Sequence, residues 1–169
     1  MMENLDGRVC WVFDEPNFDI DLIVGVTNMK IQDIEKLKEV CMSNYDKDFT
    51  NQVQEGDVII GGENFGYGHP HYPSCRALRA LGVKGIIAES FSPGFYRGES
   101  TNGFPLIECK GIAKVADRWD HIIYDWDTEE LTLVNKGITL KSEKVPEKTK
   151  DLIKYGDIIS YLQNRRLTS

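Results

Sequence analysis

The chain has 169 residues, a length that fits one domain with an adequate hydrophobic core. Hydrophobic residues make up 41% and charged residues 28%, as is ordinary for a soluble globular protein. The formal net charge of -7 argues against broad affinity for nucleic acid or an anionic membrane, so neither is an expected partner.

The N-terminus and the cysteines argue against a secreted protein, a membrane protein and a metal-binding protein. Residues 1–6 lack a basic region followed by an apolar run, and no stretch is apolar enough to span a bilayer, so a cytoplasmic location is the default expectation. No two cysteines form a C-x-x-C pair, and the histidines do not complete a zinc pattern. We therefore expect buried, reduced thiols and no metal site at Cys10, Cys41, Cys75 and Cys109.

The first half of the chain predicts strands and helices in alternation. Hydrophobic patterns predict, in order, a strand at 7–13, a short strand at 22–24, an amphipathic helix at 31–42 and a buried strand at 58–60. A glycine-rich loop then leaves this strand at 61–68. Pro73 is suited to begin the next helix, predicted at 73–81, and Gly82 to end it.

The second half begins with two more short strands, at 85–88 and 106–109, separated by a loop or short helix at 91–98. Strand, helix, strand in this order predicts a parallel βαβ unit with a right-handed crossover. Hairpin strands follow at 122–125 and 131–134, with a turn signal at 135–137, and a helix at 148–154 and the segment 157–163 complete the chain. We predict one mixed α/β domain over residues 1–169, with a β/β/α layering, a parallel βαβ core and a C-terminal hairpin region.

The most informative stretch is residues 64–73. Gly66 and Gly68, on either side of Tyr67, let the backbone turn tightly and approach a ligand, so these three are candidate substrate-binding residues. The loop leads to a helix N-terminus, which favours an anion, and it carries His69 and His71, whose side chains can exchange protons near neutral pH. The alternative is a rigid strand-to-helix turn whose histidines only face solvent.

Two nucleotide-binding patterns do not fit this loop. A dinucleotide fingerprint G-x-G-x-x-G would need a glycine where His71 stands, and no acidic ribose anchor is suitably placed. The loop also lacks the G-x-x-x-x-G-K-[ST] pattern of phosphate-binding loops.

Four segments, in order, carry a resemblance that covers nearly the entire chain. Residues 17–21 correspond to N-x-D-T-D, with Ile20 in place of the threonine. Residues 56–66 follow G-D-(I/V)-I-(V/I)-x-G-x-N-F-G, residues 87–97 follow I-A-x-S-F-x-x-x-F-Y-R and residues 103–109 follow G-x-P-x-I-E-C. The chain thereby resembles the small, swivelling domain of the aconitase superfamily, and most closely the stand-alone small subunit of 3-isopropylmalate dehydratases.

This resemblance implies a hydro-lyase made of two subunits. The large subunit is expected to bind a [4Fe–4S] cluster that acts as a Lewis acid, so the cofactor is not expected in this chain. The small subunit is expected to close over the cluster. The implied reaction removes and re-adds water on a hydroxylated di- or tricarboxylate.

The active-site loop departs from the family pattern G-x-G-S-S-R-E-H. Where the family has a serine that acts as the base, a second serine and an arginine that binds a carboxylate, this chain has His69, Pro70 and His71. We expect His69 to abstract the proton beside a carboxylate and His71 to hold a substrate oxygen. The alternative is a non-catalytic binding or regulatory paralogue, and a self-sufficient enzyme is disfavoured because no metal-ligand set is evident.

Further candidate residues lie outside this loop. Arg97 matches the arginine of the F-Y-R segment, and Asp19 and Asp21 are lesser candidates that could instead cap a turn or pair with a partner subunit. Residues 26–29, which include Asn28, correspond to the family's specificity segment and contain no arginine. This favours a small alkyl group, as in dimethylmalate or isopropylmalate, over an extra carboxylate, unless the segment is simply a surface loop.

Overall fold

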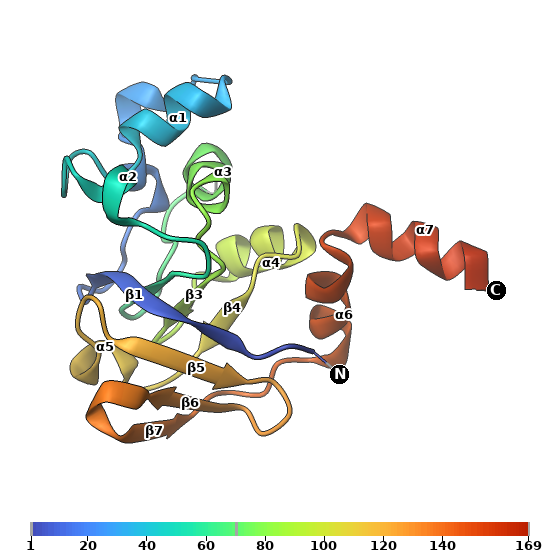
Figure 1. Cartoon of the computed structure of the whole chain (residues 1–169). Coiled ribbons are helices and arrows are strands. Elements are labelled where there is room, and N and C mark those ends of the chain that lie inside the picture. The colour runs from blue at the N-terminus through green and yellow to red at the C-terminus, as the bar shows by residue number, and fades with distance from the viewer. Residues whose placement is uncertain (1, 70, 169) are drawn as a thin grey trace.

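The computed structural model of the chain describes residues 2–69 and 71–168. A seven-stranded sheet with the order β4-β3-β2-β1-β5-β6-β7 forms its centre (Figure 1). Strands β1 to β4 are parallel, and β5 to β7 continue the sheet in antiparallel fashion, so the predicted mixed sheet is confirmed. The strands span Leu5–Phe13 (β1), Val58–Gly61 (β2), Gly85–Ala88 (β3), Leu106–Glu108 (β4), His121–Asp125 (β5), Glu130–Leu133 (β6) and Ile138–Lys141 (β7).

Strand β1 belongs to both halves of the sheet. Its residues 5–8 pair with β5, whereas Val9 and the residues after it pair with β2. The register shifts between Val9 and Trp11, which places a bulge at Cys10 and bends the strand. Because of this change of partner, β5, β6 and β7 curl over one face of the parallel strands as a second β-layer (Figure 1).

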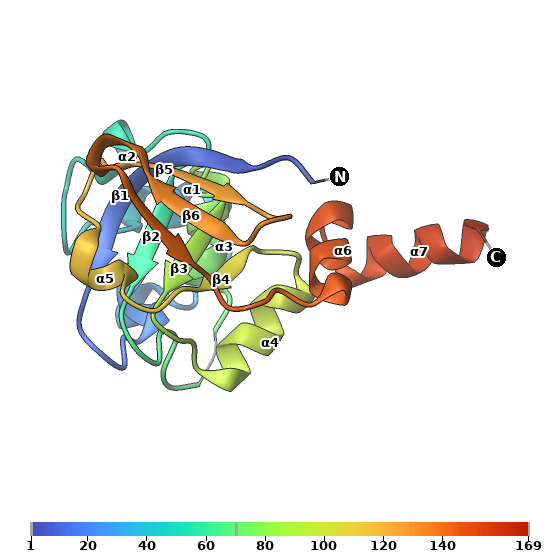
Figure 2. The same cartoon turned by 90° about the horizontal axis from the view of Figure 1, so that it is seen from below.

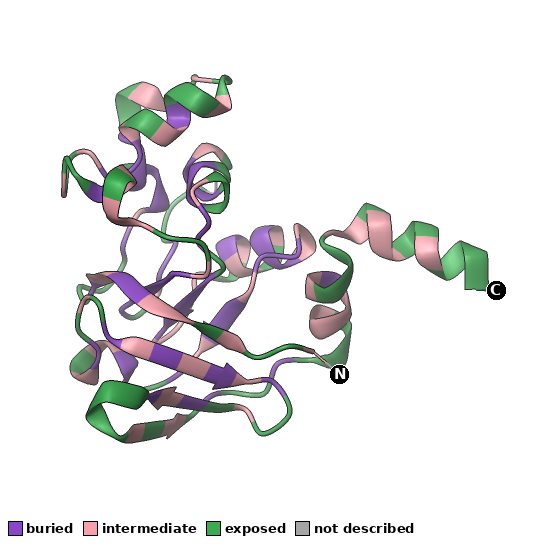
Figure 3. Ribbon diagram, in the orientation of Figure 1, coloured by how far each residue is buried: buried purple, intermediate pink, exposed green. Residues whose placement is uncertain are grey.

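The parallel strands are buried on both faces, as continuous apolar runs predict. Ile59 and Ile86 pack in a core on the helical side, whereas Ile60 and Ile87 pack in a second core with Tyr124 and other residues of the hairpin layer. Figure 3 shows the buried positions concentrated in the strands and on the helices next to them. The predicted β/β/α layering is thus confirmed.

Helices α1, α3 and α4 lie on the face of the parallel strands opposite the hairpin layer, and α7 extends away from the body (Figures 1 and 2). As predicted, α3 begins at Pro73, and Gly82, with φ of 100°, follows its end. The α-helices span Ile34–Val40 (α1), Phe49–Gln52 (α2), Pro73–Ala80 (α3), Pro93–Thr101 (α4), Ile112–Val115 (α5), Glu147–Tyr155 (α6) and Ile158–Thr168 (α7), and 3-10 helices span Ile20–Ile23 (η1), Val26–Asn28 (η2) and Val134–Lys136 (η3).

Several expectations about elements were wrong. The apolar run at 22–24 is not a strand, because the Asp19 side chain caps the 3-10 helix η1 by accepting the N–H of Asp21 at 2.9 Å. Helix α1 is shorter than predicted, because it begins only after its cap, Asp33, and the chain turns left-handed at Met42, where φ is 62°. Strand β7 and the short helices α2 and α5 were not predicted.

Candidate functional site

The glycine-rich loop leaves the carboxyl end of β2, the edge of a parallel sheet at which ligands usually bind. The segment that follows β1 holds this loop on one side. The N–H groups of Gly66 and Tyr67 donate to the carbonyl oxygen of Phe18 at 2.9 and 3.1 Å, and the Asn64 amide donates to the Asn17 side chain at 2.8 Å. Two segments of the resemblance, residues 17–21 and 56–66, therefore meet in space.

The segment that follows β3 holds the loop on its other side. Phe65 donates its N–H to the Ser90 carbonyl at 3.0 Å, and Ser92 donates its N–H to the Phe65 carbonyl at 2.9 Å. The Asn64 N–H donates to the Ser90 hydroxyl at 2.8 Å. Backbone hydrogen bonds to both neighbours make the first half of the loop a fixed part of the fold.

The two loop glycines differ in what they require. Gly66 has φ of 88°, and a Cβ placed there would lie 2.3 Å from Cγ of the buried Phe95. Only glycine allows this approach of the loop to α4. Gly68 has φ of 100°, but its nearest neighbour is the Asp19 carboxylate, at 3.6 Å from such a Cβ. Tyr67, between them, is 56% exposed and is not part of the hydrophobic core.

The structure separates the environments of the two histidines. His69 is exposed, and no hydrogen-bond partner of its ring is present among the described residues. His71 is also exposed, but its Nδ1 lies 2.7 Å from Oδ2 of Asp21. Pro70, which stands where the family has its second serine, lies outside the described residues.

Asp21, which the sequence offered as a lesser site candidate, is the residue that contacts His71. It is 8% exposed, and its other oxygen, Oδ1, is buried without a hydrogen-bond partner in the described part of the chain. Burial raises the pKa of the Asp21 carboxyl, the nearby Asp19 carboxylate raises that pKa further, and the hydrogen bond with His71 partly offsets both. Asp19 itself caps a turn, which was one of the two alternatives considered for it.

The remaining predicted site residues lie around the loop. Arg97 is exposed on α4, two residues beyond the Phe95 ring that contacts Gly66, and no partner for its guanidinium is present among residues 2–69 and 71–168. Asn28 ends η2, and its side-chain amide donates to the Val24 carbonyl at 2.8 Å. The side-chain nitrogen of Asn28 is therefore used in a hydrogen bond within the segment 24–28, and the side-chain oxygen is available to a ligand.

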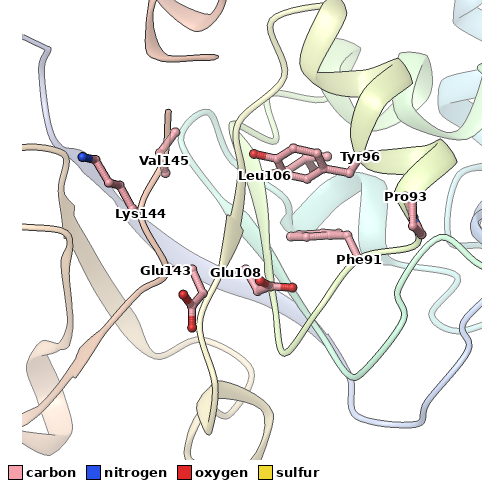
Figure 4. Close-up of a pocket in the computed structure, with 8 residues that line it drawn as sticks. All are labelled: Phe91, Pro93, Tyr96, Leu106, Glu108, Glu143, Lys144 and Val145. Carbon is pink, nitrogen blue, oxygen red and sulfur yellow. The ribbon is translucent and has the colours of Figure 1, made fainter. Parts of the chain in front are cut away.

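Two hollows near this edge of the sheet do not contain the histidines. One, of about 230 Å³, lies between α4, β4 and the segment 143–145, with the Glu108 and Glu143 carboxylates close to its apolar wall (Figure 4). The other, of about 500 Å³, has Asp14, Glu63 and Glu89 in its lining. Carboxylates outnumber the one lysine in each lining, Lys144 in the first hollow and Lys114 in the second, which disfavours an anionic substrate. The two histidines of the loop are instead exposed.

The donor atoms of the described residues do not form a metal or cluster site. No group of three or more His, Cys, Asp and Glu side chains there is arranged to hold a metal ion. All four cysteines are buried thiols, as expected, and burial raises the pKa of Cys41 to about 12 and that of Cys109 to about 11. These side chains do not fit an iron–sulfur cluster, which needs accessible thiolates.

Residues 17–110, more than half of the chain, match the model of the aconitase C-terminal domain. The chain belongs to this family. It is 35% identical, over 149 residues, to the 3-isopropylmalate dehydratase small subunit of Caldanaerobacter subterraneus subsp. tengcongensis, a match that covers 88% of this chain and 92% of that relative. It is 32% identical, over 146 residues, to the 2,3-dimethylmalate dehydratase small subunit of Eubacterium barkeri, covering 86% and 90%.

A solved structure agrees with the computed fold. The crystal structure of a 3-isopropylmalate dehydratase from Methanocaldococcus jannaschii is similar to this aconitase-family chain with a TM-score of 0.86 and 31% identity, covering 98% of this chain and 97% of that one. The expected small-subunit fold of the aconitase superfamily is thereby confirmed.

The names of these relatives also bear on function. They confirm the expectation of a hydro-lyase subunit and do not favour the non-catalytic alternative. A small subunit implies a heteromeric assembly with a larger partner. None of the helices within residues 2–69 and 71–168 is long and apolar enough to cross a membrane.

Proposed function

We propose that the chain is the small subunit of a two-subunit, iron–sulfur-dependent hydro-lyase that acts on a 2-hydroxy dicarboxylate with a small alkyl substituent. The observation that carries this proposal is the place of the altered loop. In a chain of this family, the loop stands at the carboxyl end of the parallel strands, and His69 and His71 are exposed. Proton transfer there needs a second surface that excludes water, and a large subunit would supply it.

The chemistry assigned to the loop is a dehydration and its reverse. His69 takes the proton from the carbon beside a substrate carboxylate, a double bond forms, and the bond between carbon and the hydroxyl oxygen breaks. The departing hydroxide becomes water by taking up one proton, and His69 releases the proton that it accepted, so the net products are the unsaturated diacid and water. His71 holds a substrate oxygen through its ring. The backbone around Gly66, Tyr67 and Gly68 lines the substrate, and Arg97 offers a guanidinium to a second carboxylate.

We place the iron–sulfur cluster on the large subunit, as the resemblance implies. Bound there, it would supply a Lewis acid to the substrate hydroxyl. The described side chains of this chain do not form a site that could hold a cluster. This chain would contribute a base and side chains that bind oxygen atoms of the substrate.

The substrate class follows from the segment around η2. Residues 26–29 contain no charged side chain that could pair with an additional carboxylate, and Val26 is 66% exposed. An unpaired anion would be costly to desolvate against this segment, whereas a methyl or isopropyl group would not. The relatives named for 3-isopropylmalate and 2,3-dimethylmalate make these two diacids the first substrates to test.

The test is anaerobic co-expression with a cluster-binding large subunit from the same organism. The purified assembly, the small chain alone and the large chain alone are each given a panel of 2-hydroxy diacids, and the unsaturated product is followed by its absorbance. We expect turnover of an alkyl-substituted diacid by the assembly and by neither subunit alone. Absence of turnover on every diacid, with a fully loaded cluster, would overturn the proposal.

A further inference from the structure

The pair formed by Asp21 and His71 joins two segments that are fifty residues apart in sequence. His71 Nδ1 and Asp21 Oδ2 are 2.7 Å apart, and while the His71 side chain is 53% exposed, that of Asp21 is only 11% exposed. A buried carboxylate therefore stands behind an exposed imidazole at the surface where the substrate is proposed to bind.

A purely structural role does not account for Asp21. The capping of η1 is performed by Asp19, whose Oδ1 accepts the N–H of Asp21. Oδ1 of Asp21 has no hydrogen-bond partner among the described residues, and burying an unsatisfied polar atom opposes folding. Within those residues, the one side chain to which the Asp21 carboxylate is hydrogen-bonded is that of His71. The buried charge thus weakens the fold, and its one strong contact is to a residue of the proposed site.

The hydrogen bond determines how the ring can be used. When the Asp21 carboxyl is ionised it can only accept a hydrogen bond, and the proton of the bond is then carried by Nδ1 of His71. The ring is then held in one orientation, and Nε2 remains for an external partner. A ring that lies between two carboxylates, that of Asp21 and that of a substrate, donates one N–H to each when it carries both protons.

We propose, on the basis of the function proposed above, that Asp21 is a positioning residue that orients His71 so that its Nε2–H holds a substrate carboxylate. The carboxylate–imidazole pair takes the place that the family resemblance gives to an arginine at position 71. An arginine carries its own permanent charge and a rigid fork of donors. Histidine has neither, so a second residue must fix the direction of its donor, and Asp21 is the residue in contact with it.

The kinetic test is a double-mutant cycle in the assembled enzyme with Asp21→Asn, His71→Gln and the double variant. Each single variant should raise KM by about 10-fold to 100-fold, the effect of losing a charge-assisted hydrogen bond, and change kcat far less. If Asp21 acts through His71, then Asp21→Asn should have no further effect on KM in the His71→Gln background. Asp120→Asn, which removes a buried carboxylate paired with Lys136 elsewhere, is the matched control and should leave KM unchanged.

A spectroscopic test reports the pair without turnover. The chain has 3 histidines, so nitrogen-15 spectra of its imidazole rings are readily assigned by substitution. In the full chain, Asp21→Asn should shift the Nδ1 resonance of His71 and leave those of His69 and His121 in place. Thermal unfolding of each variant checks that the fold persists.

The outcomes separate the two proposals. Wild-type turnover with additive effects of the two substitutions on KM, or with an unchanged His71 resonance in Asp21→Asn, would overturn the positioning role and leave the hydro-lyase function standing. A wild-type assembly inactive on every diacid would overturn that function, and the substrate-holding role of Asp21 with it.

Discussion

Replacing Gly66 by alanine tests whether the loop must touch helix α4. The new Cβ would lie 2.3 Å from Cγ of Phe95, a distance at which one of the two must move. Phe95 is fixed by neighbouring rings, with centroids 5.9 Å away at Phe65 and 6.2 Å away at Phe91. Overpacking of this kind costs about 1–3 kcal/mol, and the left-handed backbone adds about 1–2 kcal/mol for a residue with a Cβ. We expect Gly66→Ala to lower the free energy of unfolding by about 2–5 kcal/mol.

Two other glycines provide graded controls for this measurement. Gly68→Ala should cost only the backbone part, about 1–2 kcal/mol, because its Cβ would meet no atom closer than 3.6 Å. Gly98→Ala should stabilise the chain by up to about 1 kcal/mol, because it lies inside α4 and its Cβ would meet nothing within 4 Å. Urea unfolding followed by tryptophan fluorescence measures all three. A Gly66→Ala chain as stable as wild type would refute the reasoning.

Three further predictions concern buried ionisable groups. Asp57, which accepts two hydrogen bonds from Arg8, is 1% exposed, so Asp57→Ala should lower the free energy of unfolding by about 3–5 kcal/mol, and a change below about 1 kcal/mol in urea titrations would contradict this. Burial raises the pKa of Glu99 above its ordinary value, so ionisation of this carboxyl weakens the fold as the pH rises toward the raised pKa. Glu99→Gln should therefore have a higher free energy of unfolding than wild type at neutral pH, and the difference should shrink in acid. A difference that does not change with pH would contradict this prediction. Because burial raises the pKa of Cys41 to about 12 and of Cys109 to about 11, the native chain should react with a disulfide reagent far more slowly than the unfolded chain, and equal rates would disprove the burial.

Much of the scaffold could be predicted from the sequence because local and global preferences agree there. Apolar runs at 58–60 and 85–88 predict buried parallel strands, and Pro73 and Gly82 predict the ends of α3. The same order of elements places the loop between them at the carboxyl edge of the sheet. The glycines at 66 and 68 predicted a tight backbone turn, which the structure confirms.

Other features depend on contacts that sequence patterns do not encode. The apolar run at 22–24 fits a strand pattern, but Asp19 caps a 3-10 helix that includes residues 22 and 23. Strand β7 is only four residues long and has no fully buried position, so its Ile-Thr-Leu-Lys alternation is a short signal, and pairing with β6 gives it its structure. The pairing of Asp21 with His71 requires two loops to converge, and the sequence offers only the presence of two carboxylates near the start of the chain.

The turnover of His69→Ala in the assembled enzyme tests most directly the central claim that the altered loop performs the chemistry. Removal of a general base should lower kcat by about 100-fold to 10,000-fold. His121 is the matched control, because this histidine lies on β5 and is paired with Asp6 of β1, outside the loop. His121→Ala should leave kcat unchanged. A His69→Ala enzyme with the wild-type kcat, in an assembly with a fully loaded cluster, would contradict the account.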